Sequence, residues 1–99
     1  MARFDVYENP GQAGYLLDVQ ADLLSGLNTR VVVPLMPLDQ APRPAARLNP
    51  VFTVARQRYV MVTQFLAAVP RSELSRPAAS LAAQGHEIVD ALDMLFVGF

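Results

Sequence analysis

The sequence contains no cysteine, no lysine and a single histidine. The absence of cysteine excludes disulfide bonds, thiolate metal sites and cysteine catalysis. Metal sites need clustered ligands. The one histidine, His86, has only Glu87 beside it, so no metal centre and no cofactor are predicted. The eight basic residues are all arginines and lie scattered along the chain. This argues against direct binding to nucleic acid, which needs a basic stripe.

Charge and long hydrophobic runs are also scarce. Charged residues make up 17 % of the chain, and no apolar run approaches the ~18 residues that span a bilayer. Arg3, Asp5 and Glu8 interrupt the N-terminal stretch in which a signal peptide would carry its apolar segment. We therefore expect a cytoplasmic protein without membrane contact. With 53 % hydrophobic residues, so weakly charged a surface indicates an oligomer or an obligate partner.

Length and periodicity predict one β-rich domain over residues 1–99. Apolar runs or period-two alternation predict strands at residues 2–8, 15–21, 30–36, 50–55 and 58–65. Pro34 cannot donate a ladder hydrogen bond, so it marks a bulge, an edge or the end of regular pairing. Residues 66–77 are expected to form a connector with one short turn.

The pattern changes to helical period over residues 80–96. Ser80 can cap the start of this helix, although Gly85 favours a later first turn because glycine is a poor helix former. Five strands followed by one helix predict a β-dominated α+β fold. In so short a chain the sheet is expected to curl into a small, partly open barrel.

Three polar features have both a catalytic and a structural interpretation. Asp18 and Gln20 lie in an apolar strand and are either catalytic or residues that anchor loops or face solvent, and we favour the second interpretation. Arg56 and Arg58 form either an RNA-cleaving or phosphate-binding patch or a solvated hairpin turn. His86 is either a general base or a surface residue. No serine–histidine or histidine–carboxylate constellation can be drawn, so no catalytic residue and no enzymatic activity are predicted.

The chain ends in Leu95-Phe96-Val97-Gly98-Phe99 without a polar tail. Exposed termini fray and are usually polar, so an apolar terminus is either buried or presented to a partner. Leu81, Ile88, Leu92, Leu95 and Phe99 are predicted to line one helical face. A single face cannot cover Phe96, Val97 and Phe99 together. Protein interaction is therefore at least as strongly indicated as burial.

Three segments carry a resemblance to a known family. They are residues 15–24 (YLLDVQADLL), 30–35 (RVVVPL) and 90–99 (DALDMLFVGF). Together with the length and with Asn49-Pro50-Val51-Phe52, they resemble CcdB, the family of gyrase-poisoning toxins of type II toxin–antitoxin modules. The resemblance implies an SH3-like small barrel of about five or more antiparallel strands with one C-terminal helix.

The resemblance also implies partners. The toxin would be a homodimer in which the two helix ends approach each other. It would bind the DNA gyrase A subunit and trap gyrase on cleaved DNA. A cognate CcdA-like antitoxin would neutralise it by folding a disordered segment onto the toxin. We expect the antitoxin to contact the loops at residues 9–14 and 37–47.

The gyrase-contacting positions of the family fall on the loop after the second strand and on the helix end. In this sequence they are Leu23, Leu24, Asp93, Phe96, Val97, Gly98 and Phe99. The gyrase-poisoning members end in Trp-Gly-Ile, whereas this chain ends in Val97-Gly98-Phe99, and Asp93 replaces the usual asparagine. Loss of an aromatic anchor commonly costs ~2 kcal/mol or more, about thirtyfold in affinity. Phe99 supplies an aromatic ring two residues later.

Two alternative functions stay open. One is an endoribonuclease toxin of the MazF/Kid-like fold, for which Arg56, Arg58 and either Asp18 or His86 are the available residues. The other is a family member that has lost gyrase poisoning and only binds its antitoxin, which Val97 in place of the tryptophan suggests.

Overall fold

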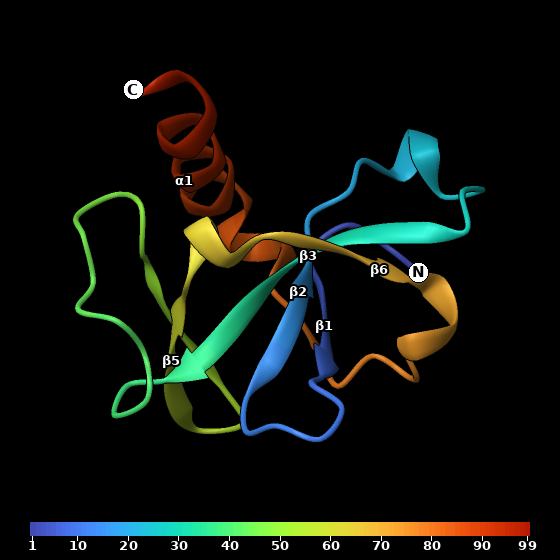
Figure 1. Ribbon diagram of the computed structural model, residues 1–99, viewed down its shortest axis with the longest axis horizontal. Helices are drawn as coiled ribbons and strands as arrows, with labels where there is room; N and C mark the ends of the chain where they lie inside the picture. The colour runs from blue at the N-terminus through green and yellow to red at the C-terminus, as the bar shows by residue number, and fades with distance from the viewer.

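The computed structural model describes residues 1–99 as one antiparallel sheet that is nearly closed into a barrel, followed by a single α-helix (Figure 1). The seven strands are β1 (Asp5–Glu8), β2 (Tyr15–Asp18), β3 (Thr29–Pro37), β4 (Val51–Val54), β5 (Gln57–Met61), β6 (Ala67–Pro70) and β7 (Ala79–Ser80). Four 3-10 turns are η1 (Asp22–Leu24), η2 (Thr63–Phe65), η3 (Arg71–Glu73) and η4 (Ala82–Gln84), and the helix α1 spans Gly85–Val97. The predicted β-dominated α+β fold is confirmed. None of the helices combines the length and apolar character needed to cross a membrane.

Strand β3 is the centre of the sheet because it pairs with three other strands. The order is β4-β5-β3-β2-β1-β7, and β6 also pairs with β3. Strand β2 runs along one side of β3, while β6 pairs with residues 29–32 and β5 with residues 35–37 on the other side. Pro34 lies between these two segments, and its carbonyl accepts from the N–H of Val62 at 3.0 Å. Its missing N–H faces the gap between β6 and β5, so Pro34 marks a break in pairing, as predicted.

Strand β6 was not predicted from the sequence. Residues 66–77, predicted to be a connector, contain both β6 and the turn η3. The segment Ala67–Pro70 has weak strand propensity and no alternation. It becomes a strand because β3 pairs with it, so that Arg30 faces Val69 across the ladder. Strand formation that depends on a distant partner leaves little trace in the local sequence.

Helix α1 begins at Gly85, which confirms the later start. The predicted cap of α1 by Ser80 is wrong, because Ser80 belongs to β7, where it pairs with Asp5. Its Oγ accepts from the N–H of Ala82 at 3.2 Å and so supports the turn η4 instead. Gly85 lies against Phe4, and a Cβ at Gly85 would approach the Phe4 ring to 3.1 Å. Packing therefore favours the smallest residue at this position.

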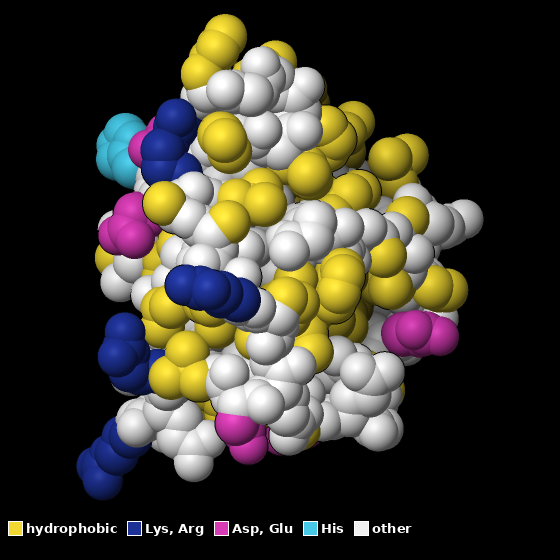
Figure 2. All heavy atoms as spheres, turned by 60° about the vertical axis from the view of Figure 1, so that its left-hand side comes forward, with side chains coloured by type: hydrophobic (Ala, Val, Ile, Leu, Met, Phe, Trp, Pro, Cys, Tyr) yellow, Lys and Arg dark blue, Asp and Glu magenta, His cyan; other side chains and the backbone are white.

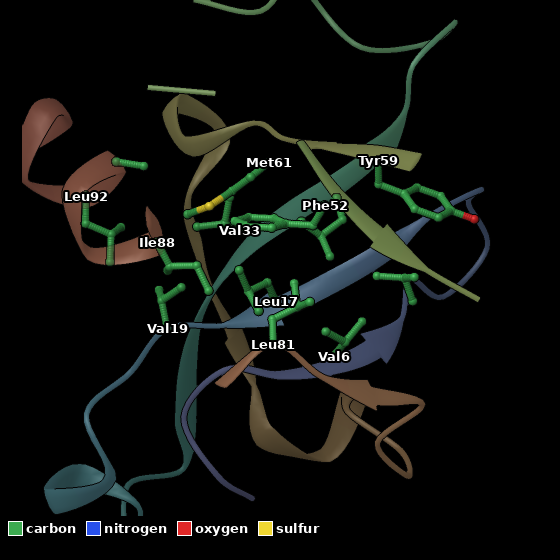
Figure 3. Close-up of a cluster of buried hydrophobic side chains, with 13 residues drawn as sticks. Val6, Leu17, Val19, Val33, Phe52, Tyr59, Met61, Leu81, Ile88 and Leu92 are labelled. Carbon is green, nitrogen blue, oxygen red and sulfur yellow. The ribbon is translucent and has the colours of Figure 1, made fainter. Parts of the chain in front are cut away.

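The helix and the sheet enclose one main hydrophobic core. Helix α1 buries Ile88, Ala91 and Leu92 against the inner face of the sheet (Figure 3). The sheet contributes, among others, Val6, Leu17, Val33, Phe52 and Met61. A smaller cluster contains Tyr7, Leu16, Val32 and Leu74. Since successive strand residues point to opposite faces, this cluster lies on the outer face of the same strands.

Candidate functional site

Helix α1 continues beyond the core and ends in exposed apolar residues. Phe96, Val97 and Phe99 are 68 %, 58 % and 75 % exposed. In Figure 1 the helix rises away from the sheet, and its C-terminal end projects from the top of the molecule. The predicted burial of Ile88 and Leu92 on one helical face is confirmed. The placement of Phe99 on that face is wrong, because the chain leaves the helix before it.

Gly98 ends the helix in the left-handed conformation. Its φ is +84°, and its N–H bonds to the carbonyls of Asp93 and Met94 at 3.1 and 3.2 Å. A Cβ at Gly98 would meet no atom within 4 Å, so the glycine is required by the backbone conformation and not by space. The cap turns the last residue out of the helical path.

Several exposed apolar groups gather at this end of the helix. We call Met94, Phe96, Val97 and Phe99 the helix-end patch. All four are exposed. Figure 2 shows hydrophobic side chains at the top of the molecule and across the face below it, while charged side chains lie mostly along the left and lower margins. An exposed apolar surface of this kind marks an interaction site.

A second exposed apolar feature is the segment from residue 21 to residue 28, which we call the leucine turn. Leu23 is 94 % exposed, while Leu24 and Leu27 are each about half exposed. Side chains that lie outside the turn attach it to the rest of the protein by hydrogen bonds. The side chain of Gln20 donates to the carbonyl of Leu24 at 3.0 Å, and the side chain of Arg71 donates to the carbonyl of Ser25 at 3.1 Å. The family resemblance implied that Leu23 and Leu24 contact a partner, but Leu27 and these hydrogen bonds were not predicted.

The seven residues predicted to contact a partner are all exposed. They belong to two separate surfaces. In Figure 1 the leucine turn and the end of α1 project from the same side of the molecule but stand well apart. One chain therefore does not bring Leu23 and Leu24 together with the helix-end patch.

Asp18 forms a buried ion pair with Arg30. Both side chains are fully buried, with Arg30 Nη2 at 2.6 Å and Nε at 2.9 Å from Asp18 Oδ2. Desolvation raises the pKa of Asp18 above its ordinary 3.8, and hydrogen bonds from Arg30 and from the N–H of Gln20 lower it in part. The loop-anchoring interpretation of Asp18 and Gln20 is confirmed, and the solvent-facing one is wrong. Arg30 was not predicted to be the partner of Asp18, because its only signal in the sequence is an arginine at the start of an apolar strand.

The remaining polar candidates are not gathered into a site. Arg56 and Arg58 are exposed at the β4–β5 hairpin, whose two turn residues, Ala55 and Arg56, have positive φ. His86 is exposed at the start of α1. Asp18 is buried and already paired. The three candidate groups thus lie on different elements, and no cluster of three or more His, Cys, Asp or Glu side chains that could hold a metal is present.

A hollow of about 650 Å³ lies on the outer face of the sheet. It runs between the β1–β2 loop and the loop that follows β3. Its lining includes Asn9, Gln12, Leu16, Met36, Gln40 and Phe65. The lining combines apolar side chains with side-chain amides and the carboxylate of Glu73, so the hollow can take apolar side chains and also hydrogen-bond to peptide groups.

Comparison with known proteins identifies two similarities. A family model described as "CcdB protein" matches residues 3–98. Among solved structures, the fold is similar to "Endoribonuclease in complex with its cognate antitoxin from Mycobacterial species". The TM-score is 0.77 and the sequence identity 18 %, with 100 % of this chain and 98 % of that chain covered. At this identity the structural likeness shows a shared fold alone.

Proposed function

Because the chain belongs to the CcdB family of toxins from toxin–antitoxin systems, we propose that it binds the DNA gyrase A subunit and traps gyrase on cleaved DNA. Such a toxin acts by binding, without catalysis, in the cytoplasm where gyrase works. The observation that carries the proposal is the helix-end patch. Its aromatic side chains are presented to solvent by a helix anchored in the core and ended by a structured cap.

The two separate surfaces support a homodimer as the active form. A two-fold axis near the helix ends would place two helix-end patches side by side, so that the parts left uncovered by the pairing form one larger contact area. A symmetric pair of patches also fits a symmetric target such as a dimeric gyrase A subunit. We propose that the leucine turns then contact the target on either side of the paired helix ends.

Phe99 takes the role of aromatic anchor that tryptophan has in the gyrase-poisoning members. Large aromatic side chains dominate the energetics of protein interfaces. Phe99 is 75 % exposed and two residues beyond Val97, which cannot supply such a contact. The left-handed cap at Gly98 fixes the direction in which Phe99 leaves the helix.

Direct binding to the purified gyrase A subunit tests the proposal. We expect Phe99→Ser to weaken binding about thirtyfold or more, since an interface hot spot is lost. Leu38→Ser is the matched control, because Leu38 is also an exposed apolar residue, 49 % exposed, but lies in the loop after β3. Equal affinity of Phe99→Ser and Leu38→Ser would contradict the role of the helix-end patch.

The hollow on the outer face is our proposed site for the antitoxin. It lies between the two loops in which antitoxin contacts are expected, and it is distinct from the helix-end patch. Phe65 lines the hollow and is 49 % exposed. We expect Phe65→Ser to weaken binding of the C-terminal segment of the cognate antitoxin. The equally exposed Leu27→Ser should leave that binding unchanged, and the reverse ranking would contradict this placement.

The endoribonuclease alternative has less support. It rests on a fold shared with an endoribonuclease, while Asp18 is buried and the exposed candidates lie on different elements. Incubation of the pure protein with RNA separates the two functions. Cleavage that Arg58→Ala abolishes would favour the ribonuclease, and intact RNA is the result expected of a gyrase poison.

A further inference from the structure

The leucine turn owes its shape to hydrogen bonds and not to packing. The turn η1 contains no buried residue, and Leu23 is almost completely exposed. Within the turn, the N–H groups of Leu24 and Ser25 bond to Ala21 and Asp22 at 2.9 and 3.0 Å. Such local bonds alone are weak in water. The conformation therefore depends on the groups that attach the turn to the barrel.

Gln20 is the buried member of these attachments. It is 7 % exposed and lies between β2 and η1. Its Oε1 accepts from the N–H of Val31 at 3.1 Å, and its Nε2 donates to the carbonyl of Leu24 at 3.0 Å. One amide side chain thus joins strand β3 to the leucine turn, and we call these two hydrogen bonds of Gln20 the Gln20 clamp. A carboxylate or an aliphatic side chain of the same size cannot make both of these hydrogen bonds, because only the amide among them supplies a donor and an acceptor together.

The position of Gln20 is itself fixed from the core. The regular pairing of β2 with β3 ends at Asp18 and Val32, and the N–H of Val19 still bonds to the carbonyl of Val31 at 3.0 Å. The Gln20 side chain then satisfies the N–H of Val31, so the backbone can leave the sheet without an orphaned donor.

The carboxylate of Asp18 completes this arrangement. Its Oδ1 accepts from the N–H of Gln20 at 3.0 Å. Its Oδ2 is held by the buried Arg30. The polar chain therefore runs from Arg30 through Asp18 and Gln20 to the carbonyl of Leu24.

We infer that Gln20 is a positioning residue that presents Leu23 and Leu24 to the protein partner in one fixed conformation. This inference rests on the proposed function, since it assigns Gln20 to the gyrase-binding surface. A turn that is ordered before binding does not lose conformational entropy in the complex, and so it binds more tightly than a mobile one. Loss of the clamp reduces the population of the binding-competent turn and weakens the observed affinity by the same factor.

The test compares Gln20→Met with a matched variant. Asn49 is the other well-buried amide, 6 % exposed, and it bonds to the carbonyl of Met61 and to the side chain of Gln64, remote in sequence from the leucine turn. Asn49→Leu therefore controls for the loss of a buried amide as such. We expect Gln20→Met to weaken gyrase A binding about three- to tenfold, the worth of a hydrogen bond converted to affinity. Asn49→Leu should bind as the wild type does at equal folded fraction.

Two further readouts separate positioning from general stability. Amide hydrogen exchange of residues 21–28 should be faster in Gln20→Met and unchanged in Asn49→Leu. In a background that carries Leu23→Ser and Leu24→Ser, Gln20→Met should cause no further loss of affinity, because the residues that it positions are gone. Additive effects in that background would overturn the proposal.

The remaining outcomes are also decisive. Unchanged exchange at residues 21–28 in Gln20→Met would overturn the clamp, whatever the target. An equal loss of gyrase A affinity in Asn49→Leu would mean that Gln20→Met acts through general stability, and it would overturn the positioning role of Gln20. If the wild-type chain does not bind the gyrase A subunit, the proposed function fails, and faster exchange confined to residues 21–28 would still support Gln20 as the residue that orders the turn.

Discussion

At the scale of single residues, the buried ion pair of Asp18 and Arg30 is the main electrostatic feature of the core. Two ions in a low-dielectric core are stabilised only by each other and by the hydrogen bonds around them. Both carboxylate oxygens of Asp18 accept hydrogen bonds, one from Arg30 and one from the N–H of Gln20. Arg30 Nη1 has no protein partner. We therefore expect the ion pair to matter more for the position of Gln20 than for the net free energy of unfolding.

Removal of the Asp18 charge should expose this dependence. Asp18→Asn leaves an unpaired cation in the core, and we expect the free energy of unfolding in urea to fall by about 3–5 kcal/mol. Asp22→Asn is the matched control, because Asp22 is exposed and accepts one hydrogen bond, from the N–H of Arg3. The double variant Asp18→Asn with Arg30→Met should regain part of the loss. A loss of under about 1 kcal/mol in Asp18→Asn would contradict a buried charged pair.

The burial of Tyr7 predicts that folding stability depends on pH in the alkaline range. Its hydroxyl is buried without a protein partner. Burial first, and then the charges of Asp5 and Asp18, raise the pKa of Tyr7 above its ordinary 10.0. The folded state therefore holds this proton more tightly than the unfolded chain. Its stabilising contribution is complete below pH 10.0 and is lost as the pH rises through the folded pKa.

Tyr7→Phe tests this expectation. At neutral pH we expect a free energy of unfolding within about 1 kcal/mol of the wild type, because no hydrogen bond is lost. Above the ordinary tyrosine pKa the variant should lose less stability than the wild type. Urea unfolding at neutral and alkaline pH measures both quantities. A larger loss at neutral pH would show that the hydroxyl is hydrogen-bonded in the folded protein.

At the scale of elements, the end of α1 depends on one glycine. Gly98→Ala places a Cβ in the left-handed region, which costs about 1–2 kcal/mol locally. Because a residue with a Cβ disfavours this backbone conformation, we expect the C-terminal turn of α1 to fray. Global stability should then change little, while affinity for gyrase A falls. Gly11→Ala is the control, since Gly11 also has a positive φ and open space around it but lies in the β1–β2 loop. Equal affinity of both variants would contradict a directed Phe99.

Elements differed in how far the sequence could predict them. Strands β1 to β5 were predictable because each carries its own apolar pattern between turn residues. Strand β6 was not, because Ala67–Pro70 becomes a strand only by pairing with β3. The exposed helix end was predictable from an apolar terminus that no single face could cover. The Gln20 clamp was not, because it depends on a Leu24 carbonyl and a Val31 N–H whose positions the tertiary fold determines.

At the scale of the whole molecule, the chain presents two apolar surfaces and few charges. We expect light scattering to report a dimer at micromolar concentration, because the helix-end patch is exposed in a single chain and a symmetric pairing would cover part of it. Removal of Val97, Gly98 and Phe99 should leave the fold intact, since none of them is buried. A monomer at micromolar concentration would remove the dimer from the proposed mechanism.

The most direct measurement of the proposed function is a gyrase supercoiling and DNA-cleavage assay with pure protein. It compares the full chain with a variant that ends at Phe96, each at the same folded fraction. We predict that linear, cleaved DNA accumulates with the full chain and not with the shortened one. The absence of cleaved DNA with both proteins, on gyrase from the same host, would contradict gyrase poisoning and leave antitoxin binding and RNA cleavage as the functions to test.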